Sequence, residues 1–189
     1  MRLAPQRVRL LSRAPICYSK GHQDRAWAIA WNPTKPLLAS CSADKTVRLY
    51  NYRISPPSEG EGPSDGEPKF ELNTSIATGH AKTVRALAWS PSGNTLATGS
   101  FDSNVGIWQQ VGDEDEEGAW ECVSSLEGHE TECKGVAYSA SGTLLASCSR
   151  DKSVWVWEGW QHAFNQMFAW IPDYRPQYYR MPTSSVWVC

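Results

Sequence analysis

A repeat of 30 residues, present three times, constrains the fold of this chain more than any other feature of its sequence. The copies occupy residues 21–50, 79–108 and 128–157, and they align without a gap. Each begins with Gly-His, carries an Asp 22 positions after the His, and ends with an aromatic residue. Self-similarity of this kind indicates an architecture in which similar units bury their apolar faces against their neighbours. We therefore expect a row of repeated units.

Within each copy the apolar residues recur with a period of two. "VRALAW" and "TLATGS" alternate or run apolar for five or six residues, and "SPSGN" and "FDSN" place Pro, Gly, Asn and Asp where the chain must reverse. This pattern predicts three strands per copy, with a fourth strand in the spacers at 70–78 and 119–127. Ten Trp residues favour an all-β fold, because large aromatic side chains suit pleated, half-buried surfaces.

The repeat resembles the WD40 repeat, which forms one four-stranded blade of a β-propeller. The expected fold class is therefore all-β: a partial WD40 propeller of about three four-stranded blades with an irregular C-terminal tail. We expect an N-terminal segment with a strand able to close a ring (1–20), blade 1 with a polar loop at 55–68 (21–78), blade 2 with an acidic loop at 111–118 (79–127), blade 3 (128–158) and a tail outside the repeat (159–189).

The tail has no Gly-His and no Asp turn, and three interpretations of it stay open. In the first, the chain is a truncated or mis-spliced product. In the second, it is a genuine short form whose "SSVWVC" segment is the fourth strand of blade 3. In the third, it is a three-blade module that assembles into a ring. An open propeller exposes strand edges and apolar faces, so the sequence also predicts a tendency to aggregate.

Every copy contains a Ser, a His and an Asp, the residue types of a hydrolase triad. Since a catalytic site is needed only once, a set repeated at fixed spacing in each copy is better interpreted as structural. The WD40 resemblance implies a buried hydrogen-bond network in each blade, made by His22, Ser42, Asp44 and Tyr50; by His80, Ser100, Asp102 and Trp108; and by His129, Ser149, Asp151 and Trp157. The spacing leaves open whether Ser40, Thr98 and Ser147 supply the hydroxyl instead.

The resemblance also implies that partners bind the face that carries the Asp turns. Exposed Arg and aromatic residues are enriched at binding hot spots, and a basic ring suits acidic or C-terminal carboxylate peptides. Ordinary surface charge is the alternative. The candidate partner-binding residues are Arg25, Trp27, Arg85, Phe101, Lys134 and Arg150.

Composition excludes several other classes of function. A net charge of -2 gives no electrostatic reason to expect nucleic acid or an anionic membrane as a partner. The six cysteines lack metal-ligand spacing, so we expect no metal or other cofactor. We expect these cysteines to be reduced thiols in a reducing compartment rather than a disulfide framework.

Longer stretches resemble one WD40 family in particular. "CSRDKSVWVWE", "GHAKTVRALAWSPSGNTLATGSFDSNVGIW" and "WECVSSLEGHE" are similar to blades of the WD40 subunit of the cytosolic iron-sulfur protein assembly (CIA) targeting complex, over residues 20–158. This resemblance implies a non-enzymatic scaffold of the cytoplasm, and also of the nucleus, that binds no cluster itself. Its implied partners are a HEAT-repeat scaffold, a MIP-type subunit and apo iron-sulfur proteins. The alternatives are another WD40 adapter, such as a ubiquitin-ligase substrate receptor or a chromatin reader, and a non-functional truncated product.

Overall fold

The computed structural model describes residues 21–54, 68–111, 119–160 and 163–170, and in these ranges it contains strands and no helix. Consequently, the described part holds no helix long and apolar enough to cross a membrane. The strands are β1 (Ala26–Trp31), β2 (Leu37–Ser42), β3 (Thr46–Ile54), β4 (Pro68–Ala77), β5 (Val84–Trp89), β6 (Thr95–Ser100), β7 (Val105–Val111), β8 (Ala119–Leu126), β9 (Cys133–Tyr138), β10 (Leu144–Ser149), β11 (Val154–Trp160) and β12 (Ala163–Trp170).

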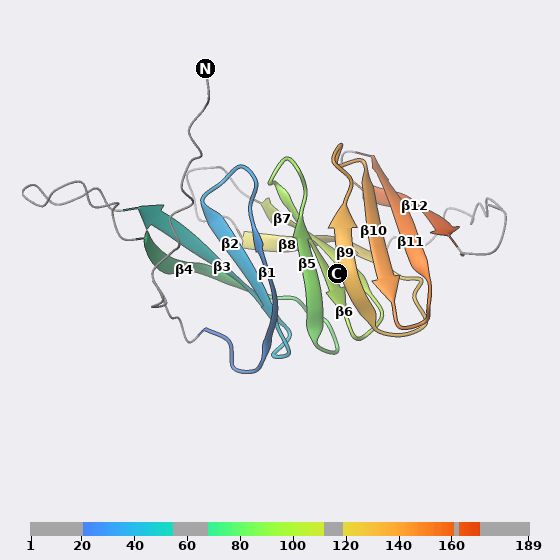
Figure 1. Ribbon diagram of the computed structural model, residues 1–189, viewed down its shortest axis with the longest axis horizontal. Helices are drawn as coiled ribbons and strands as arrows, with labels where there is room; N and C mark the ends of the chain where they lie inside the picture. Colours follow the sequence, from blue (N-terminus) through green and yellow to red (C-terminus); the bar gives the residue numbers. More distant parts are fainter. Residues whose placement is uncertain (1–20, 55–67, 112–118, 161–162, 171–189) are drawn as a thin grey trace, which may run out of the picture.

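The strands form three antiparallel sheets of four, each a meander in chain order: β1 to β4, β5 to β8 and β9 to β12. Figure 1 shows the sheets standing side by side, with the first strands β1, β5 and β9 as neighbours. Each sheet is one blade, so the expected all-β partial propeller is confirmed. The fourth strands predicted in the spacers are β4 and β8.

The turn between the second and third strand of each blade has the same backbone. Lys45, Ser103 and Lys152, each following the repeat's Asp, have φ angles of 68°, 78° and 72°. A left-handed backbone costs a residue with a side chain about 1–2 kcal/mol. A backbone hydrogen bond closes each turn, such as the one from Lys45 N–H to the Ser42 carbonyl at 3.2 Å.

The hydrophobic core lies between neighbouring blades. Blades 1 and 2 bury one cluster, and blades 2 and 3 bury a second one built from equivalent columns of the repeat. The first comprises Ala39, Cys41, Val47, Leu49 and Ile76 of blade 1 with Val84, Leu87, Trp89, Leu96 and Trp108 of blade 2. The second comprises Ala97, Val105, Ile107 and Leu126 of blade 2 with Cys133, Leu145 and Trp157 of blade 3.

Two departures from the repeat compensate for each other in the second cluster. A Cβ added to Gly99 would stand 2.8 Å from Sγ of Cys133, so a side chain at this position would have to displace that sulfur. In the first cluster the equivalent residues, Cys41 and Val84, are both fully buried. The first interface thus places a Cys opposite a Val, and the second a Gly opposite a Cys, where the Cys133 sulfur occupies the position that a side chain at residue 99 would take.

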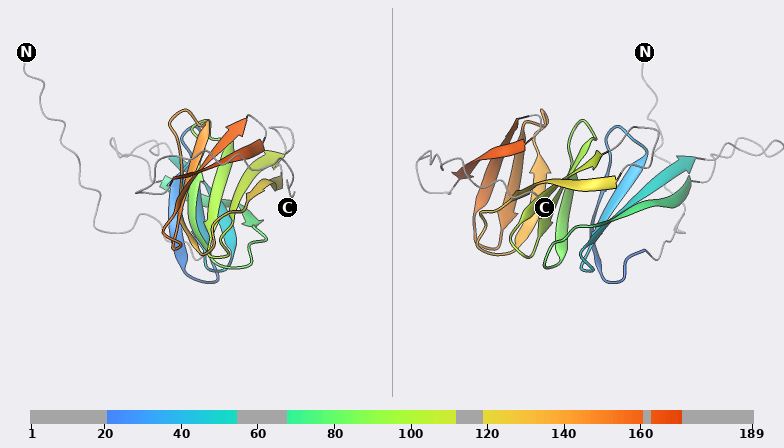
Figure 2. Two further views of the ribbon diagram at one scale, coloured as in Figure 1. Left: turned by 90° about the vertical axis from the view of Figure 1, so that its right-hand side faces the viewer. Right: turned by 180° about the vertical axis from the view of Figure 1, so that it is seen from behind.

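The C-terminal region differs from the expected irregular tail, because β12 pairs with β11 and completes blade 3 (Figure 2). The backbone edge of β11 offers hydrogen-bonding groups that any extended segment satisfies, so a strand forms here without the repeat's sequence. Blade 3 therefore continues past the expected boundary at residue 158. The predicted strands at 1–20 and "SSVWVC", most of the polar loop and most of the acidic loop lie outside the described residues.

The cysteines only partly match the expectation of reduced thiols. Cys41, Cys133 and Cys148 are free. Burial raises the pKa of Cys41 to about 11 and that of Cys133 to about 12, which keeps both as unreactive thiols at neutral pH. Cys122 is disulfide-bonded, so the expectation is wrong at that position.

Candidate functional site

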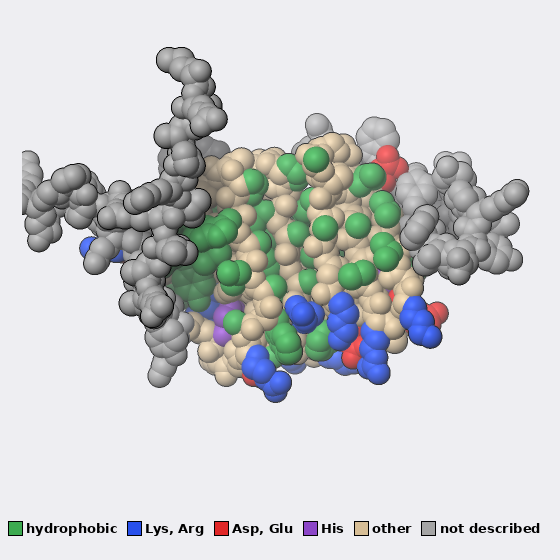
Figure 3. Space-filling view, in the orientation of Figure 1, with side chains coloured by type: hydrophobic (Ala, Val, Ile, Leu, Met, Phe, Trp, Pro, Cys, Tyr) green, Lys and Arg blue, Asp and Glu red, His purple; other side chains and the backbone are tan. Residues whose placement is uncertain are grey.

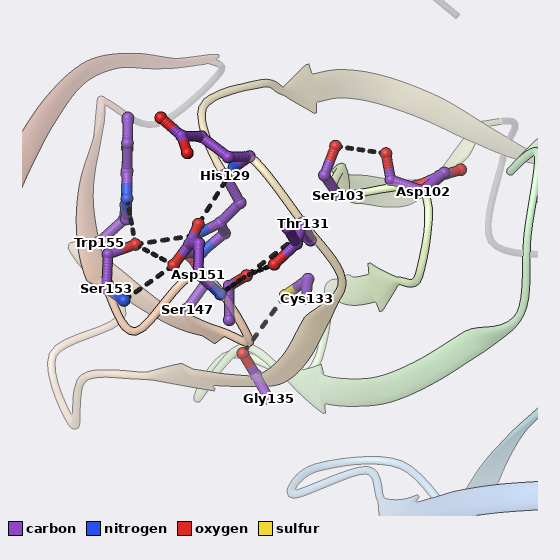
Figure 4. Close-up of polar contacts among 12 residues, drawn as sticks. Asp102, Ser103, His129, Thr131, Cys133, Gly135, Ser147, Asp151, Ser153 and Trp155 are labelled. Atoms are coloured by element: carbon purple, nitrogen blue, oxygen red, sulfur yellow. Dashed lines mark hydrogen bonds and ion pairs between the residues drawn. The ribbon is translucent and has the colours of Figure 1, made fainter.

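A chain of buried hydrogen bonds fixes the Asp turn of each blade to its strands. In blade 3, His129 Nδ1 lies 2.9 Å from Asp151 Oδ2 and His129 Nε2 lies 2.8 Å from Ser147 Oγ (Figure 4). The indole N–H of Trp157 donates to the same Ser147 Oγ at 2.9 Å. Four side chains from the loop before β9, from β10, from the Asp turn and from β11 thereby form one network.

The chemistry of these groups sets the direction of each bond. The carboxylate of Asp151 only accepts, so His129 Nδ1 carries a proton and donates. In the neutral ring Nε2 then accepts from the hydroxyl of Ser147, whose oxygen accepts from Trp157. Each polar side-chain group of this hydrogen-bond network has a partner. This is the condition under which a buried network rigidifies a fold.

Blade 2 repeats this arrangement and blade 1 modifies it. His80 bonds to Asp102 at 3.0 Å and to Thr98 at 3.0 Å, and Trp108 donates to Thr98 at 2.9 Å. In blade 1 the equivalent bonds join His22 to Asp44 at 3.1 Å and to Ser40 at 2.7 Å. Tyr50 stands where the other blades have Trp, and its hydroxyl fills the space beside Gly21.

The hydroxyl that bonds to the His is therefore the earlier of the two that the sequence left open: Ser40, Thr98 and Ser147. Assigning Ser42, Ser100 and Ser149 to this position is incorrect. These later serines lie at the strand ends, next to the turns, where each Oγ accepts from the backbone N–H of the following Asp at 3.0–3.2 Å and donates to a loop carbonyl. Such local bonds are typical of Ser at turns.

The Asp carboxyls accept more hydrogen bonds than the sequence suggested. Burial by itself would raise the pKa of Asp102, but hydrogen bonding to His80 and to the Asn104 N–H lowers that pKa to about 2. Thr46 and Ser153, two positions after Asp44 and Asp151, also donate hydroxyl bonds and hold the pKa of each of these carboxyls well below its ordinary value, against the effect of burial.

Thr98→Val tests which hydroxyl the network uses. Valine keeps the shape of Thr98 but strands the Trp108 N–H and the His80 ring nitrogen, so we expect a loss of about 2 kcal/mol in the free energy of unfolding. Ser100→Ala removes the turn bond from the Asp102 N–H and a long bond to the Lys82 carbonyl at 3.3 Å, but leaves the His80 and Trp108 bonds in place, so it serves as the matched variant with a loss of about 1 kcal/mol. Urea unfolding of both variants measures the difference, and a larger loss in Ser100→Ala would contradict the assignment.

The same turns bring residues of neighbouring strands together on one face, which we call the Asp-turn face. Phe101 N–H bonds to the Thr83 carbonyl at 2.9 Å, and Arg150 N–H bonds to the Glu132 carbonyl at 3.0 Å. The residue before each Asp is thereby held next to the residues that lead into the first strand of its blade.

Five of the six predicted partner-binding residues form a continuous band on this face. Arg85 Cζ lies 5.1 Å from the Trp27 ring centroid, and the rings of Trp27 and Phe101 are 6.4 Å apart. Lys134 Nζ stands 3.7 Å from the Phe101 ring centroid, within cation–π distance. Lys134 and Arg150 both face Glu132, at 4.0 and 3.3 Å. We call this set the cation–aromatic band: Trp27, Arg85, Phe101, Glu132, Lys134 and Arg150.

Arg25 lies apart from the band, exposed and 3.6 Å from Asp24. Glu132 is the member that was not predicted from the sequence; it lies directly before β9, where its carboxylate faces both Lys134 and Arg150. Figure 3 shows Lys and Arg side chains gathered along the edge formed by the loops before the first strands. Within the described residues, no group of three or more His, Cys, Asp and Glu is placed to hold a metal ion.

Comparison with known proteins agrees with this geometry. The family described as "WD domain, G-beta repeat" matches residues 14–51, 72–109 and 120–158. A protein of Mycosarcoma maydis named "Probable cytosolic iron-sulfur protein assembly protein 1" is 49% identical over 133 residues, covering 57% of this chain and 29% of that protein. Its namesake in Cryptococcus neoformans is 49% identical over 135 residues, covering 56% and 31%. "Protein CIA1" of Arabidopsis thaliana is 47% identical over 115 residues, covering 57% and 27%.

The chain thus spans less than a third of the length of these relatives. Their names confirm the resemblance to the cytosolic iron-sulfur protein assembly family that the sequence predicted. With the repeat matched in each of its three blades, the chain belongs to the WD-repeat family.

Proposed function

We propose that this chain is a non-catalytic adapter of cytosolic iron-sulfur protein assembly that binds protein partners through the cation–aromatic band. The observation that carries the proposal is the band itself, in which residues of all three blades join on one face. The names of the relatives support the assignment to iron-sulfur protein assembly. The proposed partners are the HEAT-repeat scaffold, the MIP-type subunit and apo iron-sulfur proteins, in the cytoplasm and the nucleus.

The burial of the Ser, His and Asp side chains supports a non-catalytic role. Geometrically, Ser147, His129 and Asp151 are arranged as in an acyl-transfer triad. The hydroxyl, however, is buried and accepts from the Trp157 indole, so no substrate carbonyl has room beside it. The same holds for Thr98 in blade 2.

The charge of the band favours acidic partner segments. It has three cations, Arg85, Lys134 and Arg150, against the single carboxylate of Glu132. Desolvation would raise the pKa of Glu132, but the positive charges of Lys134 and Arg150 lower it, and this direction supports binding of a carboxylate here. An acidic side chain or a chain terminus of a partner would meet the same cations, with Trp27 and Phe101 as apolar contacts.

Charge reversal at Arg85 tests this proposal. We expect Arg85→Glu to weaken co-purification of the HEAT-repeat and MIP-type subunits with the tagged chain at least tenfold, because an acid would then face an acidic ligand. Lys35→Glu, in the β1–β2 loop at the opposite end of blade 1, is the matched control and should bind as the parent chain does. Thermal unfolding of both variants checks that the fold is intact.

Two outcomes would overturn the proposal. One is undiminished binding by a correctly folded Arg85→Glu chain. The other is recovery of cullin adaptors or histones in place of iron-sulfur assembly subunits, which would assign the chain to another class of WD40 adapter.

A further inference from the structure

The two outermost blade faces present apolar residues that are buried or half-buried where the same repeat positions lie between blades. On blade 3, Val154 is 37% exposed, whereas its equivalents Val47 and Val105 are 0% exposed. Cys148 is exposed, whereas the equivalent Cys41 is fully buried. We call this the trailing face: Ala137, Ala146, Cys148, Val154 and Val156.

Blade 1 exposes the other set of apolar repeat positions, those that pack on the preceding blade inside the row. Ile29 is 67% exposed against 8% for its equivalent Leu87, and Trp31 is 53% exposed against 8% for Trp89. We call this the leading face: Ala26, Ile29, Trp31 and Leu38. In the interior, leading positions of blade 2 pack on trailing positions of blade 1, so the two exposed faces are the two halves of one recurring interface.

The residues that make a specific contact between blades 1 and 2 recur on these two faces. The Trp89 indole N–H donates to the Ala30 carbonyl of blade 1 at 3.2 Å. Trp31 occupies the same repeat position as Trp89 and is also a Trp, and Ala137 occupies the same position as Ala30 and is also an Ala. The ring centroids of Trp31 and Phe70 are 6.1 Å apart, and those of Trp89 and Trp120 are 5.6 Å apart. The exposed Trp31 ring therefore packs on an aromatic ring of its own blade, as the buried Trp89 ring does.

We propose that the leading face of one copy of this chain packs on the trailing face of a second copy, head to tail. The occupant is a second copy because the two faces match each other: a self-complementary contact would place leading positions against leading positions, whereas both interior interfaces pair leading positions with trailing positions. Two copies supply six blades, within the four to eight that close a propeller ring. This proposal depends on packing alone and not on the function proposed above.

Size measurement of the purified 189-residue chain, at 21.0 kDa per copy, gives the first test. We expect light scattering after gel filtration to give about twice that mass, the two-copy ring. Ile29→Asp and Val154→Asp each place a charge on one exposed face and should each give monomers. Val111→Asp, at an exposed position outside both faces, is the matched control and should stay associated.

Mixing the two defective variants distinguishes head-to-tail packing from other arrangements. Ile29→Asp keeps an intact trailing face and Val154→Asp keeps an intact leading face, so a mixture should form heterodimers that neither variant forms alone. A self-complementary dimer would lose association with only one of the variants and would not recover it on mixing, which would overturn the proposal.

A cross-link tests the register of the interface. The interior pair equivalent to residues 148 and 26 is Gly99 and Cys133, and a Cβ built on Gly99 lies 3.6 Å from the Cys133 Cβ, within disulfide range. In Ala26→Cys, diamide should therefore take up two electrons and two protons as Cys148 of one copy forms a disulfide with the thiol introduced at position 26 of another. Covalent dimers should form at least tenfold faster than in Val111→Cys, and only at background rate in Ala26→Cys combined with Cys148→Ser.

The opposite results would overturn the proposal. A monomeric parent chain with Cys148 open to alkylation would mean that the faces do not associate. A monomer with Cys148 protected would mean that another segment of the same chain covers the trailing face.

Discussion

Asp102→Ala should lower the free energy of unfolding by about 3 kcal/mol, because it removes the acceptor of three hydrogen bonds at about 1 kcal/mol each. The carboxylate accepts from His80 Nδ1 at 3.0 Å, from the Ala81 N–H at 2.8 Å and from the Asn104 N–H at 3.0 Å. Alanine leaves all three donors without this partner, and the His80 side chain among them is closed to water, whereas the Ala81 N–H lies at the surface. For a domain stable by about 5–15 kcal/mol, this loss removes a large share of the total.

Asp24→Ala is the matched control for this prediction. Asp24 is exposed and interacts with its neighbour Arg25, so its removal should change stability by less than about 0.5 kcal/mol. Urea unfolding followed by Trp fluorescence measures both variants. An Asp102→Ala chain with the parent's stability that had lost an ester-hydrolysing activity would instead identify the Ser, His and Asp set as catalytic.

The fold was predictable from sequence because its information is local and repeated. A strand period of two, turn residues at fixed offsets and three copies in register all point to the same meander sheet. The network membership of His80, Asp102 and Trp108 follows from the same register. The choice between Thr98 and Ser100 does not, because both lie on the same side of β6 and only the distance from the His80 ring separates them.

Two features could not be predicted from the repeat pattern. β12 shares no residue pattern with β4 or β8, and its pairing with the free edge of β11 is a backbone interaction that any extended segment can make. The cation–aromatic band joins Trp27 of blade 1 with Arg85 of blade 2. The sequence placed both near the same face, but their contact depends on how closely the blades pack.

The three Asp turns also make stability depend on acid, with a definite sign. A carboxyl whose pKa is lower in the folded chain than in the unfolded chain stabilises the fold above the unfolded value and loses that contribution as pH falls. For Asp102 the pKa drops from 3.8 to about 2, equivalent to about 2 kcal/mol. The pKa values of Asp44 and Asp151 are lowered further, so their contributions are larger and persist to lower pH.

Acid unfolding should therefore be steep between about pH 4.5 and pH 2. Near pH 3 the unfolded chain holds two to three more protons on these Asp residues than the folded chain, which corresponds to a slope of about 3 kcal/mol per pH unit. Urea unfolding at several pH values between 2 and 6 measures this slope. Asp102→Asn removes one of the three titrating turn carboxyls and should lower the slope by about one third. An equal slope in the parent chain and in Asp102→Asn would show that the turn carboxyls do not carry the acid sensitivity.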